Sequence, residues 1–212
     1  ADYNNEYKFC ARQTKFDYDY TLWYSKTWFE YAKLHANTFE LPKYNKEKLE
    51  EIANSLFSYT TKEDGINKII NDLFDCGVGF FTLSHLQKTY LDGATFIAEK
   101  NPFIVYTCRY DRIDNFWFVL AHEIAHVIHH YEFLSEPILD NLEEKAESER
   151  EKEADYYAGI YLNQDKVLKF GRQFGKYLNT NRLQQICNST NVSVPVALGI
   201  LQHFGVLDWR QF

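Results

Sequence analysis

Two histidines and a glutamate form the pattern in this chain that is best suited to chemistry. His122, Glu123 and His126 stand in an H-E-x-x-H sequence within a strongly apolar stretch. On a helix, residues four apart lie on one face, so both imidazoles can reach one ion. Zn²⁺ prefers such nitrogens at about 2.0–2.1 Å, and Glu123 is placed to take a proton from a coordinated water. Chance would supply the pattern in roughly one such chain in fifty, so these residues favour a zinc hydrolase.

The residues around the motif predict a buried helix over about 114–131. They contain neither Gly nor Pro, and Asp111 or Asp114 is placed to cap the start of the helix. A buried helix suits a zinc site because a low dielectric strengthens the interaction of an ion with nearby dipoles.

A second helix, predicted over about 143–163, offers a third protein ligand. Four of its residues share one face, at spacings of three, four and seven: Glu151, Ala154, Asp155 and Ala158. The alanines allow a close approach to the motif helix, so that Glu151 can bind the metal and Asp155 can accept the other N–H of His122. Glu153 should point elsewhere. The alternative is that residues 141–155 form a solvated acidic helix.

The run F-V-L-A-H-E-I-A-H-V-I-H-H, followed by E-x-E-A-D-x-x-A, resembles the ImmA/IrrE-type family of bacterial zinc endopeptidases. The resemblance extends upstream over residues 76–81, 88–94 and 109–118, where R-Y-D-R-I-D-N-F-W-F is more specific than the metal motif. This longer pattern, covering roughly residues 45–205, is similar to the branch in which the peptidase-like domain follows a helix-turn-helix domain. Members of that branch are HigA-type antitoxins or transcriptional regulators.

The resemblance implies a role for each residue of the motif. His122, His126 and Glu151 would be the zinc ligands, and Glu123 would be the catalytic base. Relatives of this type cut a helix-turn-helix repressor, so the implied partner is a protein substrate such as a repressor or another regulator. Ala125 stands where many relatives have Gly, a change that a helix tolerates well.

The fold class that these patterns predict is α+β. A small twisted three-stranded sheet would pack against helices, with a zincin-like H-E-x-x-H helix and a second ligand-bearing helix. Short apolar runs predict the strands, over 78–83, 93–99 and 103–108. Further helices are expected over 21–37, along the apolar stripes 49–57 and 66–74, and over 165–177, 180–188 and 193–204.

Domain organisation and partners follow from composition. We expect an irregular and helical N-terminal extension over 1–42 and a zinc metallopeptidase-like domain over 43–212. The chain has no Met, even at position 1, so Ala1 is expected to be a boundary with an upstream domain missing and 1–42 to include a remnant of its linker. A net charge of −7 repels phosphate, so DNA would be bound only through that upstream domain.

Four scattered cysteines predict reduced thiols and a cytoplasmic location, and no apolar run suits a membrane span.

Other polar residues have weaker signals. For His129 and His130, which follow the motif, a surface or helix-end role is expected rather than metal binding. Arg109, Asp111 and Arg112 are expected to form a polar bridge at the start of the motif helix.

The function that these observations predict is a zinc-dependent endopeptidase that cleaves a regulatory protein. A substrate peptide could add a strand along an exposed edge of the sheet. Two alternatives remain open: a non-proteolytic zinc-binding regulatory or antitoxin domain that binds a partner protein, and a broad-specificity zinc protease. The cytoplasmic character disfavours the last of these.

Overall fold

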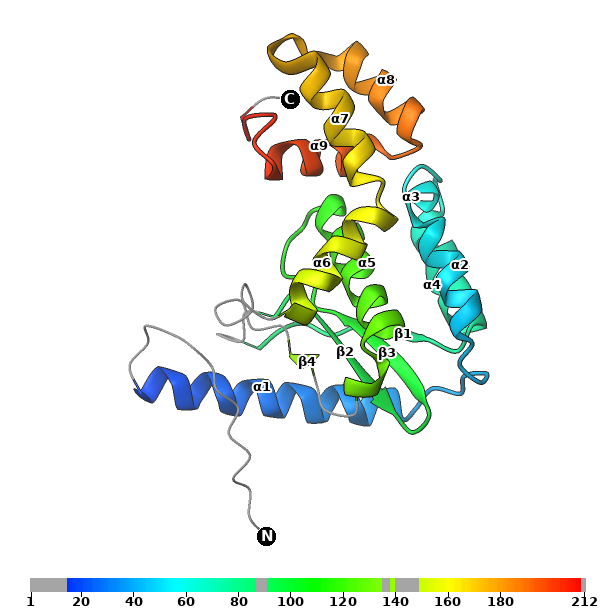
Figure 1. Cartoon of the computed structure of the whole chain (residues 1–212). Helices are drawn as coiled ribbons and strands as arrows, with labels where there is room; N and C mark the ends of the chain where they lie inside the picture. Colours follow the sequence, from blue (N-terminus) through cyan, green and yellow to red (C-terminus); the bar gives the residue numbers. More distant parts are fainter. Residues whose placement is uncertain (1–14, 87–90, 135–137, 140–148, 211–212) are drawn as a thin grey trace.

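A computed structural model describes residues 15–86, 91–134, 138–139 and 149–210 of the chain, with the side chains of 15–22, 138–139 and Lys176 left undescribed (Figure 1). Its elements, in chain order, are α1 (Lys15–Ala36), α2 (Lys46–Asn54), α3 (Leu56–Tyr59), α4 (Gly65–Asp75), β1 (Gly79–Thr82), β2 (Gly93–Ala98), β3 (Asn101–Tyr106), α5 (Ile113–His129), η1 (Tyr131–Phe133), β4 (Ile138–Leu139), α6 (Glu149–Tyr161), α7 (Gln164–Phe174), η3 (Gly175–Tyr177), α8 (Thr180–Thr190) and α9 (Val194–His203). The α+β class is confirmed.

The sheet is mixed, with the strand order β1-β3-β2-β4. Strands β1 and β3 are parallel, whereas β2 runs antiparallel to both β3 and β4. All three strands predicted from the sequence are present. Strand β3 begins earlier than expected, at Asn101, because Glu99 turns the chain with a left-handed φ of 55°. The two-residue strand β4 was not predicted, since so short a segment has no detectable periodicity.

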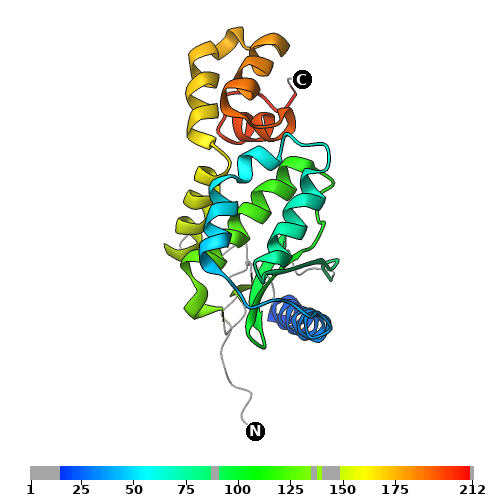
Figure 2. The ribbon, with the colours of Figure 1, turned by 90° about the vertical axis from the view of Figure 1, so that its right-hand side faces the viewer.

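Helices cover both faces of this sheet (Figures 1 and 2). Side chains of alternating strand positions point to opposite faces. One set packs with α5, and its members are Phe80, Ile104 and Tyr106. The other set packs with the C-terminal half of α1, through Trp28, Phe29, Ala32 and Ala36, and its members are Phe81, Ala94, Phe96, Phe103 and Val105. The strands are therefore buried on both sides, which makes β2 a rigid support for groups placed beside it.

Two expectations about the start of α5 are corrected. The N-cap residue is Arg112, in an extended conformation, and no side chain caps the helix there. Asp114 instead lies in the first turn and pairs with Arg112 at 2.6 Å. The predicted polar bridge is divided as well, because Arg109 pairs with Asp92 of the β2 approach at 3.3 Å, and Asp111 takes part in neither contact.

The remaining predicted helices are present, with shifted ends. Helix α6 is described from Glu149, and the part of its predicted range over 143–148 lies outside the described residues. Helices α7, α8 and α9 pack together, and α9 also packs against α5, where Gly199 lies directly against Asp114. Among the helices that the structure describes, none has the length and apolar character needed to span a membrane.

Candidate metal centre

Helix α5 places the H-E-x-x-H residues in a dry environment. Every residue from Val119 to Ile128 is buried, because β2 and β3 cover one side of the helix and α6 another. Helix α6 approaches closely through Ala154 and Ala158, both fully buried. Small side chains at this contact bring the backbone of α6 near enough for its carboxylates to reach the imidazoles of α5.

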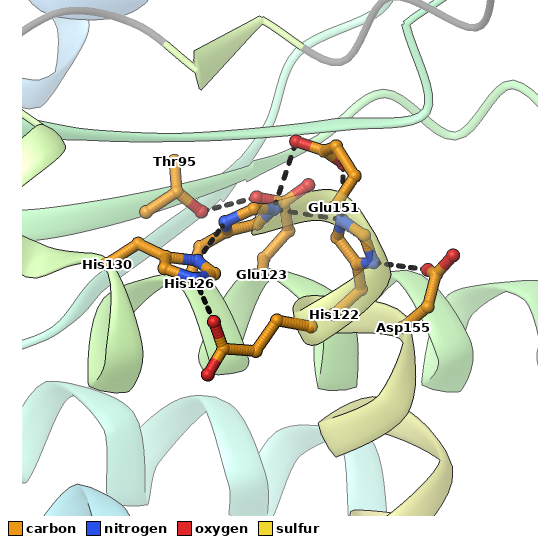
Figure 3. Close-up of polar contacts among 8 residues, drawn as sticks. Thr95, His122, Glu123, His126, His130, Glu151 and Asp155 are labelled. Carbon is orange, nitrogen blue, oxygen red and sulfur yellow. Dashed lines mark hydrogen bonds and ion pairs between the residues drawn. The ribbon is translucent and has the colours of Figure 1, made fainter. Parts of the chain in front are cut away.

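Three side chains converge between these helices (Figure 3). The Nε2 atoms of His122 and His126 lie 3.0 Å apart. Glu151 places one carboxylate oxygen 3.2 Å from Nε2 of His122 and the other 3.5 Å from Nε2 of His126. All three residues are buried, and the structure brings together these sequence-predicted ligands as a group able to hold one metal ion.

The spacing of these groups suits a tetrahedral ion. Ligands about 2.0–2.1 Å from such an ion lie roughly 3.4 Å from one another. The two imidazole nitrogens lie 3.0 Å apart, and they lie 3.2 and 3.5 Å from the two different carboxylate oxygens of Glu151. Two imidazoles and one carboxylate leave the fourth position open, which is the arrangement of catalytic rather than structural zinc sites. The residues present therefore fit zinc.

Glu123 lies beside this cluster without belonging to it. It is 2% exposed, and its Oε2 accepts a hydrogen bond from the hydroxyl of Thr95 on β2. Its Oε1 faces Gly93 so closely that a Cβ at that position would be 2.6 Å away. The carboxylate is thus held by strand β2 at both of its oxygens. Sequence reasoning missed Thr95, since no local pattern links it to a residue 28 positions later.

Comparison with protein families identifies the family of the domain that contains this cluster. Residues 79–190, more than half of the chain, match the model of the IrrE N-terminal-like domain, Peptidase M78. The chain belongs to this family. The matched range runs from β1 to α8 and includes every residue of the cluster, so the chain carries a metallopeptidase-type domain. A comparison with curated proteins finds no match.

The first histidine of the H-E-x-x-H motif, His122, is held by α6 on the side away from the cluster. Nδ1 of His122 lies 2.8 Å from Oδ1 of Asp155, the residue predicted to orient it. In the metal-free domain, burial lowers the pKa of His122, but hydrogen bonds to Asp155 and Glu151 outweigh burial and raise that pKa to about 9. A metal must therefore displace a proton from this ring, which couples metal binding to pH.

The second histidine of the H-E-x-x-H motif is held by His130, for which a surface or helix-end role was expected. His130 is 3% exposed, and its Nδ1 lies 2.9 Å from Nδ1 of His126. Its Nε2 lies 3.2 Å from Oε2 of Glu153, so Glu153 points away from the cluster, as its helical position predicted. His130 is not at the surface, but it is the C-cap residue of α5, so the helix-end alternative of the prediction is confirmed. The spacing of four from His126 was the available signal, but His130 lies just past the end of α5.

His129 is separate from the metal cluster. Its ring stacks on Tyr157 with centroids 3.6 Å apart, and its Nε2 lies 3.1 Å from the hydroxyl of Tyr161. Since both tyrosines belong to α6, His129 joins the two helices outside the cluster and has a structural role at the end of α5.

Strand β2, which lies beside Glu123, is not an edge strand of the described sheet. Strand β4 pairs with β2 at Ala94 and Thr95, and the amide of Ile97 donates to the carbonyl of Leu134. The domain's own chain therefore covers the stretch of β2 that is nearest the cluster.

Proposed function

We propose that this protein is a zinc-dependent endopeptidase that cleaves a regulatory protein, such as a helix-turn-helix repressor. The observation that carries the proposal is the meeting of three buried ligand groups with a second carboxylate, Glu123, that lies beside them but outside the ligand set. A structural metal site would have no use for this extra buried carboxylate, whereas peptide hydrolysis needs a proton acceptor at that place.

Each residue of the site has a part in the proposed reaction. His122, His126 and Glu151 would hold the zinc ion, which when bound supplies Lewis-acid chemistry to water and to the scissile carbonyl. Glu123 would accept the proton of the attacking water and pass it to the nitrogen of the leaving amine. Thr95 would keep the carboxylate of Glu123 directed at the metal position, because its hydroxyl donates a hydrogen bond to Oε2 of Glu123.

A protein substrate is supported by the family and by the architecture of the sheet. Main-chain groups of β2 lie next to Glu123, so an extended peptide paired with this strand would bring its carbonyl groups near the metal position. Strand β4 now pairs with β2 at Ala94 and Thr95, and a peptide that used the same groups would have to replace it. A repressor or similar regulator is the substrate that the sequence resemblance favours.

The cellular setting belongs to the same proposal. Cys76, Cys108 and Cys187 are free thiols, which supports a reducing compartment such as the cytoplasm. We also propose that residues 43–212 form the peptidase unit and that an upstream helix-turn-helix domain provides any contact with DNA. Residues 1–42 would then connect the two.

The test is a cleavage assay with a matched inactive variant. The zinc-loaded protein is incubated with helix-turn-helix repressors from the same genome and with an unfolded general substrate, and products are identified by mass spectrometry. Cleavage of one repressor at one site by the wild type, and none by Glu123→Gln, supports the proposal. Cleavage of every substrate would favour a broad-specificity protease. Tight repressor binding without cleavage by either protein would favour the non-proteolytic regulatory domain.

A further inference from the structure

We propose that His130 and Glu153 form a positioning relay that fixes which ring nitrogen His126 offers to the metal. The inference rests on the metal site of the proposed function and adds two residues to it. Neither residue touches the metal position: His130 contacts His126, and Glu153 contacts His130. Both are therefore positioning residues and not ligands.

The donor and acceptor of the His126–His130 and His130–Glu153 hydrogen bonds follow from the metal position at one end and the carboxylate of Glu153 at the other. Nε2 of His126 faces Glu151 and His122, so this nitrogen must be unprotonated to bind a cation, and Nδ1 must carry the ring proton. That proton is donated to Nδ1 of His130, which then acts as an acceptor. The proton of His130 is left on Nε2, where Oε2 of Glu153 accepts it. The carboxylate at one end thus selects the tautomer of the ligand at the other end.

Burial explains why a second imidazole lies between His126 and a carboxylate. His126 is 1% exposed, and Glu123 and Glu151 already place two carboxylates in the same buried region. A third charge directly behind His126 would have to be desolvated as well. The neutral ring of His130 supplies an acceptor at 2.9 Å without burying a charge, and the side chain of Glu153, which is 49% exposed, keeps its charge in contact with solvent.

Helix α6 consequently supports both histidines and supplies the third ligand. Glu151 faces the metal position, Asp155 contacts the outer nitrogen of His122 directly, and Glu153 reaches His126 through His130. Partners of this kind behind a metal-bound histidine set its orientation and basicity, and their loss costs roughly 10–100-fold in metal affinity. The relay should therefore appear in zinc affinity, even though its residues lie outside the ligand set.

The experiment measures zinc affinity by competition with a chromogenic chelator, together with the Tm of the metal-free protein. Three variants divide the relay: His130→Leu removes both hydrogen bonds, His130→Asn keeps an acceptor near the position of Nδ1 only, and Glu153→Ala removes the exposed end. Glu149→Ala is the control, because Glu149 is an exposed glutamate on the same helix. We expect His130→Leu to weaken zinc binding by roughly 10–100-fold, His130→Asn less, and Glu149→Ala not at all.

A double mutant separates a relay from a general effect of charge. Glu153→Ala should weaken zinc binding in the wild type but have no further effect in His130→Asn, whose side chain cannot reach Glu153 through an Nε2–H group. Equal effects of Glu153→Ala in both backgrounds would overturn the proposal. So would a lower metal-free Tm with unchanged zinc affinity. If His130→Leu does not fold, the zinc affinities of Glu153→Ala, His130→Asn and the double mutant still test the relay.

The same measurements distinguish this inference from the proposed function, because zinc affinity is determined without a substrate. If the His130 and Glu153 variants lose zinc affinity but the wild type cleaves no substrate, the relay is supported and the peptidase proposal fails. If these variants keep full zinc affinity but the wild type cleaves a repressor, the peptidase proposal is supported and the relay fails.

Discussion

Thr95 of strand β2 donates its hydroxyl hydrogen to Oε2 of Glu123 on helix α5, and both side chains are buried. The contact joins the sheet to the motif helix at the group that is proposed to move the proton. Gly93, two residues earlier on the same strand, leaves space for the other carboxylate oxygen. The position of the proposed base is thus determined by the strand as much as by its own helix.

Removing the hydroxyl of Thr95 should reduce turnover and leave the metal site intact. We expect Thr95→Val to lower kcat by roughly 10–100-fold, because a buried carboxylate oxygen loses its donor, while zinc affinity is unchanged. Thr95→Ser keeps the hydroxyl and should recover most of the activity. Steady-state kinetics with the cleaved repressor and zinc competition measure the two effects. Equal losses in the serine and valine variants would assign Thr95 a packing role instead.

Replacing either histidine of the cluster should remove the metal. We expect one zinc ion per chain in the wild type and none retained through dialysis in His122→Ala or His126→Ala, since two remaining protein ligands are too few for a stable site. Metal analysis by mass spectrometry gives the stoichiometry. His129→Ala is the control, because His129 contacts Tyr157 and Tyr161 instead of the cluster. Full zinc occupancy in both ligand variants would contradict the assignment.

The two acidic residues of α6 nearest His122 should differ in their effect on zinc. Glu151→Gln removes a charged ligand and is expected to abolish tight binding, whereas Asp155→Asn should weaken it by the roughly 10–100-fold typical of groups behind a ligand. Glu149→Gln, on the same helix and exposed, should bind zinc as the wild type does. Chelator competition ranks the three proteins. A larger loss of zinc affinity in Asp155→Asn than in Glu151→Gln would make Asp155 the ligand and Glu151 the orienting residue.

Substituting the proposed base should separate chemistry from binding. Glu123→Gln is nearly isosteric, and its amide oxygen can still accept from Thr95, so the fold and zinc affinity should be retained. The proton acceptor is lost, which is expected to reduce cleavage by at least about 10²–10⁴-fold. Product formation is followed alongside transcription from a repressor-controlled reporter. Unchanged cleavage with zinc still bound would rule out Glu123 as the base.

The stability of the metal-free protein should depend on pH through His122. The pKa of His122 is raised from 6.5 to about 9 in the fold. Protonated His122 therefore stabilises the folded state fully below pH 6.5, and this stabilisation is lost as the pH rises through about 9. We expect the Tm measured with a chelator to fall over this range, and the increase in Tm caused by zinc to grow, because zinc competes with the proton. His122→Ala with the chelator should show a smaller fall.

The sequence by itself determined the parts of this protein that depend on neighbours along the chain. A spacing of four places His122 and His126 on one helical face whatever surrounds them. Short apolar runs predict β1, β2 and β3 because a strand buried on both faces is largely apolar. The face shared by Glu151 and Asp155 follows from the same helical period. These are local consequences of backbone geometry, whereas the family was indicated by the resemblance of the motif residues themselves and shown by the family match.

Only the tertiary structure decided which distant groups meet. Thr95 reaches Glu123 because β2 packs against α5, and His130 reaches both His126 and Glu153 because α6 crosses the end of α5. The pairing of β4 with β2 is of the same kind. Contacts between elements depend on how their side chains fill the space between them, and no periodicity within one element records that packing.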